Sequence, residues 1–173
     1  MNESSVRVMI AKEDITKKVR ELGAKLTEDF KGHDVMLIGV LKGSFIFMAD
    51  LVREIKLPIE MDFISAKSYR GTTTTGVVNV KMDTHLEIEG KTVMLVEDIL
   101  DTGKTLSALR ETMYSRGARD VKIVTFLDKP ARRVADINAD YCCYTIEDRF
   151  VVGYGLDYNE QYRNLDYIGE VIL

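Results

Sequence analysis

The sequence has little cysteine, and it has neither an excess of positive charge nor a long apolar run. Its two cysteines, Cys142 and Cys143, are adjacent, a spacing that suits neither a disulfide across the fold nor a tetrahedral zinc site. We therefore expect both to be reduced strand residues. No apolar run approaches the roughly 18 residues of a membrane-spanning helix, and residues 1–20 lack the apolar core of a signal peptide. A soluble, cytoplasmic protein without a membrane partner is predicted.

The charge balance argues against a polyanionic polymer as the main partner. The 173 residues include 24 Lys and Arg against 28 Asp and Glu, a net charge of -4, so no overall positive field is available to hold a nucleic acid. A small phosphorylated substrate remains compatible, because backbone amides, a few basic side chains and a metal ion can hold phosphate locally. With 46% hydrophobic residues, we expect one domain, residues 1–173, with its own core.

Apolar periodicity predicts alternating strands and helices. Residues 13–30 carry apolar side chains at steps of three and four, which is typical of an amphipathic helix. Further helices are predicted at 45–55 and 105–116, and strands at 35–41, 59–66, 77–82, 93–96, 121–127, 141–146 and 150–152. The polar segment 68–76 is expected to be a mobile loop. The alternation predicts an α/β fold with a mainly parallel open sheet flanked by helices, whose ligands bind beyond the carboxyl ends of the strands.

The segment 93–105 places three carboxylates, a glycine and two threonines where a buried strand gives way to a helix. A helix N-terminus offers unpaired N–H groups and a partial positive charge, so residues 101–105 can bind a phosphate, and Gly103 permits a close approach of the chain. Alternatively, Asp101 or Thr102 merely caps the helix. Capping does not explain Glu97 and Asp98, which are expected at the exit of the strand, where carboxylates suit sugar hydroxyls or a divalent ion.

Two better-known phosphate motifs do not fit. A nucleotide triphosphate P-loop needs a glycine five residues before Gly103, and Asp98 stands there. Gly153 and Gly155 could begin a dinucleotide fingerprint, but its third glycine position holds Tyr158. Neither motif is therefore predicted.

Segment 93–105 resembles the phosphoribosyl pyrophosphate motif of type I phosphoribosyltransferases: an apolar run, two acidic residues, two apolar residues, then Asp-Thr-Gly-Lys-Thr. Four further segments resemble the hypoxanthine-guanine branch of that family in the same order: Leu41-Lys42-Gly43-Ser44, Lys67-Ser68-Tyr69, Leu127-Asp128-Lys129-Pro130 and residues 150–158. The resemblance implies transfer of a phosphoribosyl group from phosphoribosyl pyrophosphate to N9 of hypoxanthine or guanine, giving IMP or GMP. It also implies Mg²⁺ as cofactor, a small hood formed by the chain termini, and a homodimer or homotetramer.

The same resemblance implies roles for the residues of segment 93–105. Asp101 matches the catalytic residue near the purine N7, where a carboxylate can accept or stabilise the proton. Glu97 and Asp98 match the pair that faces the ribose hydroxyls and are also candidate metal ligands. The remaining residues would hold the 5-phosphate: Thr102, Gly103, Lys104 and Thr105.

Other matched residues would bind the purine. Lys129 resembles the lysine that donates to the 6-oxo group, which would disfavour adenine, because adenine presents a donor there. Phe150 resembles the aromatic residue that stacks on the purine, and the backbone of Val151 would reach the purine edge. A solvated surface lysine and a plain core phenylalanine are the respective alternatives.

The last matched residues would bind the metal and pyrophosphate. Asp157 resembles a magnesium ligand, and Arg163 an arginine that binds pyrophosphate, although either could be half of a surface ion pair. The Lys42-Gly43 peptide resembles a turn that offers its backbone to pyrophosphate, often in a cis form. Its isomer stays open. Ser68 and Tyr69 resemble the start of a lid that excludes water from the site.

Two other functions remain as alternatives. One is a regulator on the same fold that binds nucleic acid and senses phosphoribosyl pyrophosphate without turnover, and the acidic composition and the presence of Asp101, Lys129 and Asp157 disfavour it. The other is a transferase that prefers xanthine or adenine. Lys129 disfavours adenine, whereas rejection of xanthine depends on backbone positions.

Overall fold

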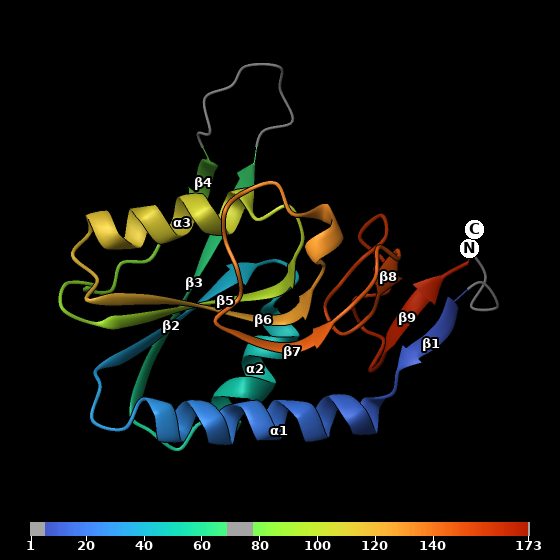
Figure 1. Cartoon of the computed structure of the whole chain (residues 1–173), viewed down its shortest axis with the longest axis horizontal. Helices are drawn as coiled ribbons and strands as arrows, with labels where there is room; N and C mark the ends of the chain where they lie inside the picture. Colours follow the sequence, from blue (N-terminus) through green and yellow to red (C-terminus); the bar gives the residue numbers. More distant parts are fainter. Residues whose placement is uncertain (1–5, 69–77, 173) are drawn as a thin grey trace.

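The computed structural model describes residues 6–68 and 78–172 (Figure 1). In chain order its elements are β1 (Val6–Ile10), α1 (Lys12–Asp29), β2 (Val35–Leu41), α2 (Phe45–Glu54), β3 (Ile59–Ser68), β4 (Val78–Met82), β5 (Thr92–Leu100), α3 (Lys104–Ser115), β6 (Asp120–Asp128), a 3₁₀ helix (Pro130–Arg132), β7 (Tyr141–Thr145), β8 (Val151–Val152) and β9 (Ile168–Val171).

The main sheet has six strands in the order β4-β3-β2-β5-β6-β7. The pairs β3–β2, β2–β5, β5–β6 and β6–β7 are parallel, and β4 runs antiparallel to β3 at the edge. The predicted α/β architecture with a mainly parallel sheet is thus confirmed.

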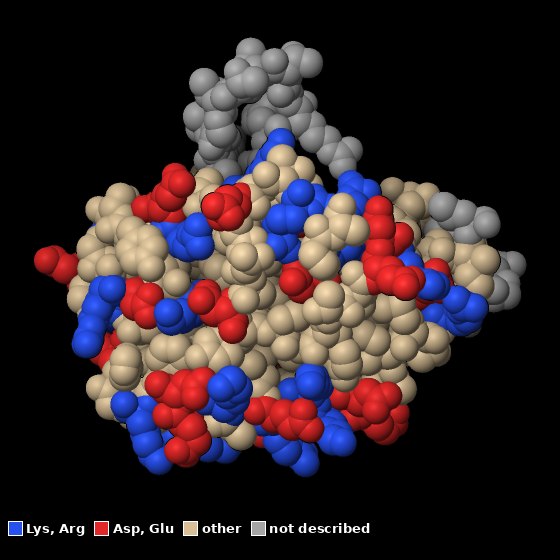
Figure 2. All heavy atoms as spheres, in the orientation of Figure 1, with Lys and Arg blue, Asp and Glu red and all other residues tan. Residues whose placement is uncertain are grey.

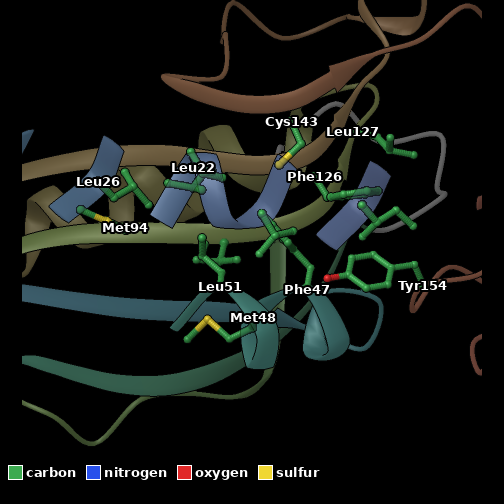
Figure 3. Packing of buried hydrophobic residues seen from close by; sticks show 14 of the residues in the cluster. Leu22, Leu26, Phe47, Met48, Leu51, Met94, Phe126, Leu127, Cys143 and Tyr154 are labelled. Carbon is green, nitrogen blue, oxygen red and sulfur yellow. The ribbon is translucent and has the colours of Figure 1, made fainter. Parts of the chain in front are cut away.

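Alternate residues of the central strands enter two separate cores. On one face, Leu37 and Val96 pack with α1 and α2, and on the other, Ile38 and Leu95 pack with α3 (Figure 1). Figure 3 shows the first core, with side chains from both helices, the sheet and the segment after β8: Leu22, Leu26, Phe47, Met48, Leu51, Met94, Phe126, Leu127, Cys143 and Tyr154. Both faces of the sheet are covered, which explains why these strands read as continuous apolar runs.

The two ends of the chain meet in a second, three-stranded sheet of order β1-β9-β8 (Figure 1). Val6 is opposite Val171, and Val151 is opposite Glu170. This sheet is the hood that the resemblance implied.

The predicted strand 93–96 was too short. Strand β5 continues to Leu100, and its pairing with β6 includes Glu97 with Thr125 and Leu100 with Asp128. Glu97 and Asp98 therefore lie within the strand rather than at its exit. Their carboxylates interrupt the apolar run, which ended the prediction, but they do not interrupt the backbone pairing.

The remaining differences are small. Helix α1 begins and ends one residue before the predicted bounds, and α3 also begins one residue earlier, at Lys104. Ser68 is the last residue of β3, and the rest of the predicted loop, residues 69–76, lies outside the described residues, as does Val77, the first residue of the next predicted strand.

The two cysteines lie on β7 without a disulfide, as predicted. Cys143 is buried, and this burial raises the pKa of its thiol to about 12. A thiol with such a pKa is almost wholly protonated at neutral pH and is therefore a poor nucleophile.

The charged side chains are mixed over the surface. Figure 2 shows lysines and arginines interspersed with aspartates and glutamates on the face that it presents. Within residues 6–68 and 78–172, no helix combines the length and the apolar character needed to cross a membrane.

Candidate active site

Three neighbouring strands bring most of the predicted site residues to one edge of the sheet. Lys42 follows β2, residues 101–105 follow β5, and Lys129 follows β6. Because β2, β5 and β6 are adjacent and parallel, their carboxyl ends lie side by side. The hood segment 150–163, which contains β8 and the turns after it, supplies Phe150, Val151, Asp157 and Arg163.

The loop after β5 leads directly into α3. Gly103 is the residue that precedes the helix, it has a φ of 79°, and no side chain makes a capping hydrogen bond. The capping alternative for Asp101 and Thr102 is therefore wrong. Around this helix start lies a hollow of about 90 Å³, which is lined by Glu97, Ile99, Leu100, Asp101, Thr102, Gly103, Thr105 and Leu106.

Gly103 is required by both its conformation and its surroundings. A φ of 79° is strained for residues that carry a Cβ atom, and a Cβ atom here would lie 2.5 Å from Cγ2 of Ile137. The N–H groups of Val134 and Ala135 both donate to the Thr102 carbonyl at 3.0 Å. The loop thus rests directly on the segment that follows the 3₁₀ helix.

One carboxylate oxygen of Asp101 accepts no hydrogen bond from the described residues. This oxygen, Oδ1, is buried. Nε of Arg132 lies 3.4 Å away as an ion-pair partner, and Nη1 of Arg132 lies 3.9 Å from Oδ2 of Asp148. A buried acceptor that has a charge partner but no hydrogen bond is poised to accept one from a ligand.

Glu97 and Asp98 are adjacent, partly buried carboxyls on β5. Burial and the neighbouring charge of Asp98 raise the pKa of Glu97 well above its usual value. Burial also raises the pKa of Asp98, while hydrogen bonds and the charge of Arg163 act in the opposite direction. Ionising both carboxyls is therefore unfavourable unless hydroxyl donors or a cation face them.

The backbone after β2 touches both β5 and the hood. A Cβ atom on Gly43 would lie 1.6 Å from Oδ2 of Asp98, and a Cβ atom on Gly155 would lie 2.1 Å from the carbonyl oxygen of Gly43. Replacing Gly155 would require the backbone to move, and replacing Gly43 would displace the Asp98 carboxylate. Glycines at these two positions let the turn after β2, the acidic pair and the hood converge.

The structure has one cis peptide bond among the described residues, between Leu41 and Lys42. The sequence left the isomer of the next peptide, Lys42-Gly43, open, and the structure shows it as trans.

Lys129 and Phe150 lie where the hood meets the main sheet. Lys129 is only 8% exposed, its Nζ donates to the carbonyl of Arg149 at 2.7 Å, and it lies 3.5 Å from Oδ1 of Asp148. The ring of Phe150 is 46% exposed and meets Tyr158 edge-on, with 5.4 Å between the centroids. The solvated-lysine and core-phenylalanine alternatives are therefore both wrong, while the neighbouring Val151 is buried in β8.

The predicted pyrophosphate residues form a chain of charges. Nζ of Lys42 lies 2.9 Å from Oε2 of Glu160, and Nη2 of Arg163 lies 3.2 Å from the same oxygen. Nη2 of Arg163 also lies 2.9 Å from Oδ1 of Asp157, and Nη1 donates to the Gly155 carbonyl at 2.8 Å. One glutamate thus pairs with both predicted cations.

The predicted metal ligands do not form a cluster. Among the described residues, no group of three or more His, Cys, Asp or Glu side chains is arranged to hold a metal ion. Mg²⁺ commonly takes one or two carboxylates and completes its shell with water and substrate phosphates. The acidic pair on β5 and Asp157 fit that mode of binding, and a cation there would also offset the repulsion that raises the pKa of Glu97.

The sequence did not point to several residues of this region, and one residue that it did point to lies outside the described residues. Arg132, Asp148 and Glu160 were not singled out, since isolated charged residues after a strand or in a turn read as solvated surface. Only the backbone of Ser68 is described, and Tyr69 lies outside the described residues.

Comparison with known proteins places the chain among enzymes. The model of the phosphoribosyl transferase domain family matches residues 9–159. The hypoxanthine-guanine phosphoribosyltransferase of Streptococcus pneumoniae is 52% identical over 164 residues, which cover 94% of this chain and 91% of that protein. The enzyme of the same name from Bacillus subtilis is 48% identical over 170 residues, 98% of this chain and 94% of that one.

A solved structure shows the same fold. The crystal structure of a hypoxanthine phosphoribosyltransferase from Staphylococcus aureus superimposes with a TM-score of 0.94 at 46% identity, and the match covers 99% of this chain and 96% of that one.

Proposed function

We propose how the residues of this chain carry out the reaction of its family. The chain belongs to the phosphoribosyl transferase family, among the hypoxanthine-guanine phosphoribosyltransferases. It serves purine salvage by phosphoribosyl transfer to hypoxanthine or guanine. The observation that carries the proposal is the buried acceptor of Asp101, which lies directly before the N-terminus of α3. This acceptor supports the proposal because it lies close to the helix start that we propose binds phosphate.

In this mechanism, the 5-phosphate of phosphoribosyl pyrophosphate binds at residues 102–105. The N-terminal turn of α3 contributes backbone N–H groups and the positive end of the helix dipole. The side chains of Thr102 and Thr105 add hydroxyl donors, and the Lys104 ammonium adds charge. Glu97 and Asp98 accept hydrogen bonds from the ribose hydroxyls, which satisfies two carboxyls that otherwise repel each other.

The purine binds between the hood and the end of β6. The exposed face of Phe150 stacks on the base, and Nζ of Lys129 donates to the 6-oxo group. The backbone of Val151 meets the other edge of the base. Since Lys129 already has the Arg149 carbonyl as an acceptor, its direction is fixed before the base arrives, which is what discrimination against a 6-amino group requires.

The chemical step then needs positioning and one proton acceptor. Purine N9 attacks the ribose carbon that carries pyrophosphate, the bond to pyrophosphate breaks, and the configuration at that carbon inverts. Asp101 accepts or stabilises the N7 proton as the base becomes the nucleophile. Arg163, Lys42 and the backbone of Gly43 bind the departing pyrophosphate.

We propose Mg²⁺ as the cofactor. When bound with pyrophosphate, it would supply partial neutralisation of the leaving group. Asp157, Glu97 and Asp98 are the residues that would hold it. Ser68 and Tyr69 are proposed to begin a lid that keeps water from the activated ribose.

We also propose that the chain works in the cytoplasm as a homodimer or homotetramer. The described surface includes exposed apolar side chains, among them Met61, Met82 and Leu86, that a second copy could cover. Light scattering after size-exclusion chromatography tests this: a single species of monomer mass at micromolar concentration would contradict it.

The test of the mechanism is pyrophosphate release with phosphoribosyl pyrophosphate and each of hypoxanthine, guanine, xanthine and adenine, with and without Mg²⁺. We expect turnover of hypoxanthine and guanine that needs Mg²⁺ and is greatly slowed in Asp101→Ala. If phosphoribosyl pyrophosphate binds but no purine is consumed, the transferase mechanism is wrong, and the chain is a sensor of that metabolite.

A further inference from the structure

Arg133 is a partly buried arginine that lies next to the site without lining the hollow. Its side chain is 13% exposed. Nε donates to the Asp101 carbonyl at 2.9 Å, Nη2 to the Leu100 carbonyl at 3.3 Å and Nη1 to the Ile137 carbonyl at 2.6 Å, and Nη2 also pairs with the Asp128 carboxylate. One guanidinium thus joins the end of β6 to the loop after β5.

Three successive carbonyls, that of Leu100 at the end of β5 and those of Asp101 and Thr102 in the loop, accept hydrogen bonds from residues 133–135. The carbonyl of Leu100 also accepts from the N–H of Lys129 at 2.9 Å. Arg133 binds those of Leu100 and Asp101, and the N–H groups of Val134 and Ala135 bind that of Thr102. A planar trans peptide sets its carbonyl and its N–H on opposite sides. The N–H groups of residues 101–103 therefore point away from residues 133–135.

The hollow lies on that opposite side. Its lining includes residues 99–103 but none of residues 133–135. We propose that Arg133 is a positioning residue: by binding the carbonyls of Leu100 and Asp101, it aims the loop N–H groups into the hollow where the 5-phosphate binds. The inference rests on the proposed function and extends it to a residue that does not touch substrate.

Arginine suits this role better than lysine. The guanidinium is planar and carries donors on three nitrogens, so it can satisfy separate acceptors in fixed directions. A lysine could keep the charge pair with Asp128, but its single ammonium cannot reach all four acceptors at once. Arg133→Lys should therefore restore only part of what Arg133→Met removes.

The experiment compares a ligand with and without a 5-phosphate. The affinities of GMP and guanosine are measured by titration calorimetry for the wild-type chain, Arg133→Met and Arg133→Lys. We expect Arg133→Met to weaken GMP binding by roughly 10- to 100-fold, with guanosine changed by less than about threefold, and Arg133→Lys to fall between Arg133→Met and the wild type. Steady-state assays should show a raised KM for phosphoribosyl pyrophosphate but not for hypoxanthine.

A matched control separates positioning from general stability. Arg116 also pairs with an aspartate, Asp83, and it lies at the opposite end of α3 from the phosphate loop. Arg116→Met should lower the melting temperature while leaving the ratio of GMP to guanosine affinity unchanged.

The outcomes are distinct. If Arg133→Met has the same ratio of GMP to guanosine affinity as the wild type, the positioning role is wrong and Arg133 is structural. Should Arg133→Met not fold, the same comparison is made with Arg133→Lys. If the wild-type chain itself binds GMP no more tightly than guanosine, the proposed phosphate site fails, and this inference fails with it.

Discussion

The loop after β5 and the hood turn around Glu160 both carry groups proposed to bind phosphate, but they are held in different ways. At the loop, backbone N–H groups and the partly buried Arg133 bind three successive carbonyls, those of Leu100, Asp101 and Thr102. In the turn, Glu160 pairs with Lys42, and both side chains are 63% exposed. Exposed ion pairs contribute only about 0–1 kcal/mol. The loop on the 5-phosphate side is therefore preorganised, whereas Lys42 on the pyrophosphate side is held by an exposed contact that a substrate can replace.

This contrast fits the two phosphates of the reaction. The 5-phosphate stays attached to the ribose throughout, so a fixed anchor serves both substrate and product. Pyrophosphate must bind and then leave. An anionic side chain that pairs with Lys42 and Arg163 when pyrophosphate is absent would ease its release. Glu160 provides one, since it lies within ion-pair distance of both Lys42 and Arg163.

The largest effect is expected at the fixed side. Asp101→Asn keeps the size of the side chain but removes its basicity, so kcat should fall by about 10²- to 10⁴-fold. Asp136→Asn changes an exposed aspartate of the segment that packs on the loop and should leave kcat unchanged. Equal kcat values for the two variants would rule out Asp101 as the catalytic group.

The next effect concerns the base. Lys129→Gln should lower kcat/KM for hypoxanthine by roughly 100-fold and narrow the discrimination against adenine, because the buried ammonium that pairs with a 6-oxo group is lost. The KM for phosphoribosyl pyrophosphate should not change. Competition assays with the two bases measure this ratio, and undiminished rejection of adenine would show that another group reads the purine.

The next prediction concerns how the raised pKa of Glu97 affects the stability of the fold at different pH values. The pKa of Glu97 is raised in the folded chain, so the folded state binds a proton more tightly than the unfolded state, and wild-type stability falls as pH rises from the unfolded to the folded pKa. Without Mg²⁺, Glu97→Gln should therefore be more stable than the wild type at pH 8, and this advantage should shrink toward pH 4. Melting temperatures across this range measure the difference, and a pH-independent difference would contradict the raised pKa.

The smallest effect is expected at the exchangeable side. Glu160→Gln removes the competing anion, so the KM for phosphoribosyl pyrophosphate should fall by roughly two- to fivefold, the range expected for an exposed ion pair. Glu28→Gln disrupts an exposed pair with Lys31 near the end of α1 and should change no kinetic constant. A raised KM in Glu160→Gln would mean that Glu160 organises the cations rather than competing for them.

The sequence predicted the elements whose signal is local. Strand β2 was predicted from Val35 to Leu41, the bounds that the structure shows, because an uninterrupted apolar run marks a strand buried on both faces. Strands β1 and β9 were not predicted individually. They are short, and their pairing joins residues as far apart as Val6 and Val171, so no local pattern specifies it.

The same limit explains what was missed in the site. Asp101 and Lys129 could be proposed because the residues around them form recognisable motifs. Arg133 could not, because its partners at Leu100 and Asp101 are backbone carbonyls about 30 residues earlier, and such acceptors leave no trace in residue types. The cis bond at Leu41–Lys42 likewise follows from no local residue preference, because no proline is present there, and only the family resemblance pointed to this turn.

The crystal structure of the chain with bound GMP tests the central claim most directly. We predict that the 5-phosphate lies against the backbone N–H groups of residues 102–105, with the purine over the ring of Phe150 and its 6-oxo group within hydrogen-bond distance of Nζ of Lys129. A phosphate bound instead by Lys42 and Arg163, with the loop after β5 empty, would contradict the assignment of the two sides.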